Sequence, residues 1–151
     1  MAVTVSTYNH TAKKLLDLSL VDEAENFYLE LLTGDASFLA SHTTQAQVDN
    51  SGGHEVYGNG WTQGGENLSN VAGTTTTTND AMLDASDVEV TATGGSVGPA
   101  DAALVYVDEG GAGTVLTPLW FIDFGESKTA TVGNVFPVIW NASGIAQVTV
   151  A

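Results

Sequence analysis

The chain has 151 residues, the size of one ordinary domain, and its 18 acidic and 3 basic residues give a formal net charge of −15. Because Lys and Arg are needed to neutralise phosphates, this composition argues against binding to nucleic acid or to an anionic membrane surface. Cysteine is absent, which excludes disulfides and thiolate sites, and no apolar run is long enough to span a membrane. We therefore expect a single domain over residues 1–151.

The N-terminal segment predicts a strand that begins at once. Residues 3–8 alternate apolar and polar side chains, as a half-buried strand does. The same segment, residues 1–8, could instead serve as an arm that reaches a neighbouring molecule. Residues 12–20 fit a helix and a strand equally well.

Two further segments complete the first third of the chain. Residues 26–33 form an aromatic and Leu-rich run that ends at a turn signal, which predicts a buried strand. Residues 37–48 predict a short helix, capped near Ser41 or Thr43. We expect no other helix.

Glycine pairs and threonine dominate the middle of the chain. The glycines bracket two expected short strands, residues 54–57 and 66–71. The threonine run at residues 74–78 predicts a strand or an extended loop, and residues 74–80 are a second candidate arm. Residues 88–93 alternate cleanly and predict another strand.

The last third of the chain predicts the most apolar strands. Residues 102–107 form a continuous apolar run, typical of a central strand, and residues 115–124 are the most hydrophobic stretch. Residues 136–140 and 145–150 are the last two expected strands. The turn residues at 141–144 predict that these two strands form a hairpin.

Together these segments predict an all-β fold. Roughly eight to ten short antiparallel strands at regular spacing, with turn chemistry between them, favour a β-sandwich or jelly roll. At most one short helix, near residues 37–48, accompanies them.

Two patterns that suggest catalysis do not hold up. Gly94-Gly95-Ser96-Val97-Gly98 matches the G-x-S-x-G nucleophile elbow, but a proline follows it and no histidine lies downstream of His54. It is better explained as a glycine-rich turn between strands. The three histidines, His10, His42 and His54, lack metal-binding spacing on one helix. We expect no enzyme and no bound cofactor.

Calcium is the one metal that the sequence leaves open, because loop carboxylates can hold it. The acidic residues that cluster along the chain are Asp80, Asp84, Asp87 and Glu89, followed by Asp108 and Glu109. The calcium-loop pattern itself is absent, and a solvated acidic face explains these residues equally well.

Aromatic and apolar residues near the N-terminus and in glycine-rich loops are the candidate interface. Trp120 and Trp140 lie inside apolar strands and are expected in the core, whereas Trp61 lies between Gly60 and Thr62 and is expected at the surface. The candidate interface residues are Val3, Val5, Tyr8, Tyr57 and Trp61.

Several short segments, in a fixed order along the chain, carry a resemblance. They are residues 8–13 (YNHTAK), 27–33 (FYLELLT), 42–44 (HTT), 55–65 (EVYGNGWTQGG), 121–125 (FIDFG) and 140–145 (WNASGI). As an ordered set they resemble a family of small structural proteins of tailed bacteriophage particles, although this chain is unusually acidic and poor in lysine for that family. The resemblance implies a jelly-roll head decoration or cement protein and supplies no catalytic residues.

From the residues and the resemblance together we expect a virion protein on the capsid exterior. Its expected partner is the major capsid protein, and we expect it to form a homo-oligomer, a dimer or a trimer. Two other functions stay open: a tail, baseplate or fibre component that contacts the host surface, and a carbohydrate-binding β-sandwich module with Trp61 and Tyr57 as its platform.

Overall fold

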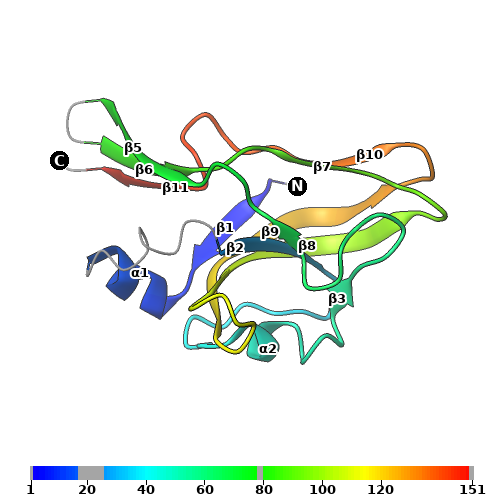
Figure 1. The fold of residues 1–151 in the computed structure, drawn as a ribbon, viewed down its shortest axis with the longest axis horizontal. Helices are drawn as coiled ribbons and strands as arrows, with labels where there is room; N and C mark the ends of the chain where they lie inside the picture. The colour runs from blue at the N-terminus through cyan, green and yellow to red at the C-terminus, as the bar shows by residue number, and fades with distance from the viewer. Residues whose placement is uncertain (1, 17–25, 78–79, 150–151) are drawn as a thin grey trace.

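The computed structural model describes residues 2–16, 26–77 and 80–149, and most of these residues lie in antiparallel strands or the turns between them (Figure 1). The predicted all-β, sandwich-like fold is therefore confirmed. The helices are α1 (Asn9–Leu16) and α2 (Gln45–Val48). The strands in the described part are β1 (Thr4–Thr7), β2 (Phe27–Leu32), β3 (Glu55–Val56), β4 (Glu66–Asn67), β5 (Ala72–Thr77), β6 (Asp80–Asp84), β7 (Val88–Thr91), β8 (Val97–Asp108), β9 (Leu116–Ala130), β10 (Val135–Val138) and β11 (Ala146–Thr149).

The strands form three sheets in two layers. The large sheet has the strand order β1-β9-β8-β2-β3, and β4 also pairs with β2. Strands β10 and β7 form a second sheet, and β11, β6 and β5 form a third. Figure 1 shows the β7–β10 sheet lying over one face of the large sheet, and the β5–β6–β11 sheet continuing the same layer to the left.

Strands β8 and β9 form the centre of the large sheet, and both of its faces are covered. On β8, Ala103 and Val105 belong to the inner core between the layers, whereas Leu104 and Tyr106 belong to an outer core on the opposite face. This two-sided burial explains why residues 102–107 form a continuous apolar run in place of an alternating one. The pairing of β8 with β9 shifts register between Val105 and Tyr106, next to Pro118.

The outer core is covered by the N-terminal helix and the loops around α2. It contains Tyr8, Leu32, Val48 and Phe121. Helix α1 lies across the start of β9, where the Thr11 hydroxyl donates a hydrogen bond of 2.9 Å to the carbonyl of Leu119.

The helix content differs from the prediction in two respects. Helix α2 occupies only the last residues of the segment 37–48, and its N-cap is Thr44, one residue after Thr43. The side-chain oxygen of Gln47 accepts hydrogen bonds from the backbone N–H groups of Thr43 and Thr44, which fixes this start. A second helix, α1, occupies residues 9–16 and exceeds the single helix expected. It begins three residues before the segment 12–20, whose type the sequence left open, and covers residues 12–16 of that segment, whereas residues 17–20 lie outside the described residues.

The predicted C-terminal hairpin is wrong, although its turn forms. The N–H of Gly144 donates to the carbonyl of Asn141 at 2.8 Å, but β10 pairs with β7 and β11 pairs with β6. The N–H of Ile145 donates to the carbonyl of Leu83 at 2.8 Å, which joins the end of this turn to β6. The turn therefore moves the chain from one small sheet to the other.

The candidate arms are strands of the chain's own sheets. Residues 4–7 pair with β9, and the threonine run forms β5, which pairs with β6. Residues 78–79, between β5 and β6, lie outside the described residues. Strand β6 was not predicted, because its acidic residues suggested a loop.

We predict that alanine is far less tolerated at Gly65 than at Gly94. Both glycines have positive φ, +90° and +77°, but a Cβ at Gly65 would lie 2.5 Å from the carbonyl oxygen of Leu29, whereas a Cβ at Gly94 meets nothing within 4 Å. Gly94→Ala should lower the free energy of unfolding by about 1–2 kcal/mol, the usual cost of left-handed alanine. Gly65→Ala should cost at least about 1 kcal/mol more, because β2 must shift. Urea unfolding measures both, and equal losses would contradict the close approach.

Candidate functional site

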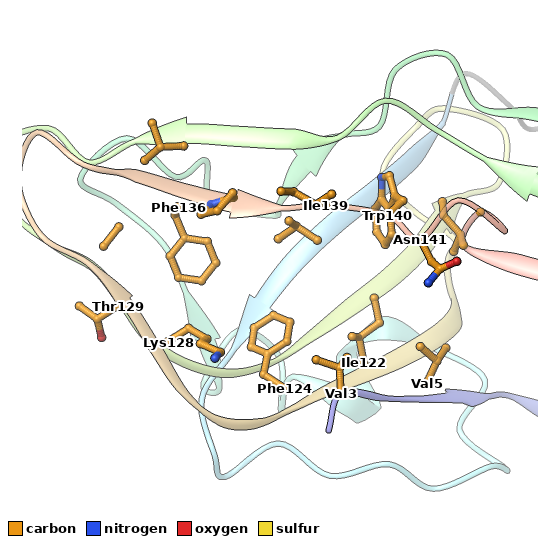
Figure 2. Close-up of a pocket in the computed structure, with 16 residues that line it drawn as sticks. Val3, Val5, Ile122, Phe124, Lys128, Thr129, Phe136, Ile139, Trp140 and Asn141 are labelled. Carbon is orange, nitrogen blue, oxygen red and sulfur yellow. The ribbon is translucent and has the colours of Figure 1, made fainter. Parts of the chain in front are cut away.

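A wide apolar groove runs along the side of the sandwich where β1 and β10 lie on either side of β9 (Figure 2). We call it the edge groove, and its volume is about 840 Å³. Its lining residues are Val3, Val5, Ile122, Phe124, Lys128, Thr129, Ala130, Val135, Phe136, Pro137, Val138, Ile139, Trp140, Asn141, Gly144 and Ile145.

The groove is open because the upper layer leaves β1 uncovered. Val5 is opposite Ile122 of β9, so its side chain projects from the face of the large sheet that carries the inner core. Ile122 is buried, yet Val5 is 53% exposed and Val3, two residues before it on the same face, is 58% exposed. The inner core therefore ends at this edge with apolar side chains that nothing in the described chain covers.

The floor and the opposite wall of the groove are also apolar. Phe124 on β9 and Phe136 on β10 are buried at its base, whereas Ile139, just after β10, is 67% exposed. The indole N–H of Trp140 donates a hydrogen bond of 3.0 Å to the carbonyl of Ser86, which holds this ring at the groove wall. Figure 2 shows these side chains converging from β9 and β10.

The groove contains almost no charge. Among the described residues that line it, Lys128 alone is charged, and its ammonium group lies 2.5 Å from Glu126. An apolar surface of this kind on a chain of net charge −15 favours contact with another apolar surface over the binding of a charged small molecule.

The structure brings together only part of the predicted interface. Val3 and Val5 line the edge groove. Tyr8 lies in the outer core because it is three residues from Val5, an odd spacing that puts its side chain on the other face of the strand. Tyr57 is exposed but does not line the groove.

The prediction that Trp61 lies at the surface is wrong, because its side chain is only 2% exposed. The backbone N–H and carbonyl groups of Gly58 and Trp61 pair with each other, so the loop folds back tightly. Gly60 lets this loop approach the carbonyl of Thr91 closely, and Trp61 packs edge-on against Phe136 at 5.6 Å. The glycines on either side, which suggested an exposed tip, are what allow the ring to enter the core.

Sequence reasoning missed most of the groove. Phe124, Phe136 and Ile139 were recognised only as parts of apolar strands. Their arrangement around an uncovered edge depends on which strands pair, and the sequence carried no signal for that pairing.

Three of the six carboxylates proposed for calcium have other contacts. Asp108 accepts hydrogen bonds from the N–H of Gly113, and Asp87 accepts one from the N–H of Trp140. Glu109 pairs with Lys14 at 2.9 Å. Across residues 2–16, 26–77 and 80–149, no three His, Asp or Glu side chains are grouped so that they could hold a metal ion.

The segment that matches the nucleophile elbow leads directly into strand β8. A nucleophile elbow requires a helix after the serine. The expected glycine-rich turn between strands therefore describes this segment correctly.

A second group of polar residues is buried beneath the outer face of the large sheet. Gln45 of α2 donates hydrogen bonds from its amide nitrogen to Glu30 at 2.9 Å and to Asp49 at 2.8 Å. Burial is the largest cause that raises the pKa of Glu30, to about 8, and the negative charges of Asp49 and Glu55 act in the same direction. Burial also raises the pKa of Glu55. This group ties α2 to the sheet.

No protein-family model matches this chain, and comparisons with curated proteins and with solved structures find no match either. Neither described helix is long and apolar enough to cross a membrane.

We predict that Glu30→Gln flattens the pH dependence of stability. A carboxyl group whose pKa rises on folding, here from 4.5 to about 8, binds its proton more tightly in the native state. Its stabilising effect is complete below about pH 4.5 and is lost as the pH rises through about 8. Thermal unfolding should give a melting temperature that falls more steeply over this range for the unsubstituted chain than for Glu30→Gln.

The matched control is Glu89→Gln, which removes an exposed carboxylate on β7. It should leave the pH slope close to that of the unsubstituted chain. Parallel slopes for the Glu30 and Glu89 variants would contradict the role assigned to Glu30.

Proposed function

We propose that this chain is a non-enzymatic structural protein of a tailed-virus particle. It binds the outer surface of the capsid, with the major capsid protein as its partner, and stabilises the head. The observation that supports this proposal best is the edge groove: an uncovered apolar end of a rigid sandwich, suited to adhesion and lacking the convergent polar groups of a catalytic pocket.

The architecture supports adhesion in two ways. Both cores are built on the long β8–β9 pair, so the groove wall on β9 is held rigidly and loses little entropy on binding. Many identical copies on one particle would add avidity, so that each contact can be modest.

The charge distribution supports a protein partner over nucleic acid. A net charge of −15 with three lysines keeps the chain away from the packaged genome and steers it toward a basic protein surface. The dimer or trimer expected from the sequence belongs to the same proposal. Its association should strengthen with salt, which screens the repulsion between copies.

A tail or baseplate component is the second candidate, since the same groove would serve there. The carbohydrate-binding alternative is weaker, because Trp61 is buried and Tyr57 alone remains exposed from the expected aromatic platform.

We predict that the chain is present in purified particles at on the order of hundreds of copies, as expected for a protein that follows capsid symmetry. Quantitative gel densitometry against the major capsid protein measures this ratio. About a dozen copies or fewer would place the chain in the tail, and absence from particles would refute the proposal.

We also predict that a charge in the edge groove abolishes capsid reinforcement. Particles prepared without the chain should lose their genome at a lower temperature, and adding back the unsubstituted chain should restore stability. Val5→Asp should bind particles at least about tenfold more weakly, because it buries a carboxylate in an apolar contact. Thermal release of the genome, read with a DNA-binding dye, provides the measurement.

The control for this experiment is Val132→Asp. Val132 is exposed in the turn before β10 and does not line the groove, so this variant should restore stability fully. Equal loss in both variants would show that added charge anywhere weakens binding.

A further inference from the structure

Strand β1 has one edge whose backbone groups face away from the sheet. The N–H of Tyr8 donates to the carbonyl of Leu119, and the register of β1 against β9 continues unbroken from there. In an antiparallel pair the inward-facing residues alternate, so Ser6 and Thr4 also direct their backbone groups toward β9. The backbone groups of Val3, Val5 and Thr7 therefore face outward, and among the described strands β1 pairs with β9 alone.

The opposite rim of the groove does not offer such an edge. The carbonyl of Asn134 accepts a hydrogen bond from the N–H of Ala92, the residue directly after β7. Because inward positions alternate along β10, Phe136 and Val138 also direct their backbone groups toward β7. Pro137 therefore occupies an outward position on β10 and has no N–H to donate. Proline at this position is a common protection of an edge strand, so of the two described rims of the groove β1 is the one that offers a continuous row of donors and acceptors to an incoming strand.

A strand added beside β1 would have two different faces. Its side chains level with Val3 and Val5 would point toward the mouth of the edge groove and cover those exposed valines. Its alternate side chains would lie on the outer face next to Thr4 and Ser6, with the exposed carboxylate of Asp123 opposite Thr4 on β9. The incoming segment must therefore alternate apolar residues with polar ones.

Charge decides which segment fits. A second copy of this chain would bring another net charge of −15 to the edge, whereas a basic segment would be attracted both by the whole chain and by Asp123. The apolar lining rejects charge on the groove side, so basic side chains belong at the alternate, outward positions.

We propose that β1 accepts an extended segment of a partner protein, in which apolar residues alternate with Lys or Arg, as an added strand at the β1 edge of the large sheet. This inference rests on the proposed function only in taking the edge groove as the binding surface. Main-chain hydrogen bonds to Val3, Val5 and Thr7 supply affinity, and the apolar side chains entering the groove supply specificity.

The test uses the full chain and a display library of short linear peptides. Selection on the immobilised chain should enrich peptides that alternate apolar and basic residues. A synthetic copy of an enriched peptide should then slow amide hydrogen exchange at Val3, Val5 and Thr7, measured by NMR. A version with the same composition but with the apolar and basic residues in separate blocks should bind at least about tenfold more weakly.

Proline substitutions separate backbone pairing from groove contact. Val5→Pro removes an outward N–H and leaves the bonds to β9 intact, so it should keep the fold and weaken peptide binding at least about tenfold. Val132→Pro, in the exposed turn before β10 and outside the groove lining, is the matched control and should bind normally. Val5→Ser keeps the N–H and should weaken binding through the lost apolar contact alone, so it tests the groove even if Val5→Pro unfolds.

Three outcomes would overturn the inference. They are enrichment of acidic or non-alternating peptides, protection of β10 amides in place of β1 amides, and a dimer without peptide in which the β1 amides are already protected. These results leave the particle experiments untouched, because copy number and head stability are measured without any peptide. Absence of the chain from particles, conversely, would refute the proposed function and leave the peptide results standing.

Discussion

The pairing of β8 with β9 is the constraint on which the rest of the structure depends. It is the longest pairing in the large sheet, and its two faces supply the inner and the outer core at once. Every other element packs on this pair or extends it: β1 and β2 flank it, the small sheets cover one face, and α1 and α2 lie toward the other. Because the centre of the large sheet is buried on both faces, the edges of the sheet are the places where a further strand could pair.

The edge groove exists because the upper layer does not cover the whole of the lower layer. The upper layer is divided into separate small sheets, and it leaves Val3 and Val5 on the lower layer exposed. The result is an edge strand with apolar residues on its inner face and an unpaired backbone beside it. Natural proteins usually protect such an edge, and Pro137 does so on the other rim. That β1 has no such protection is the main reason to regard it as an interaction surface.

The buried group around Glu30 has a different role from the groove. It lies on the outer-core side of the sheet, where Gln45 joins the carboxyl groups of Glu30 and Asp49 and so ties α2 to β2. A carboxyl group that stays protonated at neutral pH costs less to bury than a charged one, which is why the core tolerates it. The fold thus combines a hydrogen-bonded group on the outer-core side with one exposed apolar edge at the groove.

Local pattern determined most of the strands, and pairing determined the site. The alternation at residues 3–8, the apolar run at 102–107 and the glycine-rich turns predicted strands where strands exist, because side-chain period and turn chemistry act over a few residues. The sequence also identified Val3 and Val5 as candidate interface residues. Only the tertiary structure decided that Trp61 folds inward, that the last two strands join different sheets, and that no described element covers the valines at β1. Each of these outcomes depends on contacts between segments far apart in the chain, and such contacts leave no mark on local periodicity.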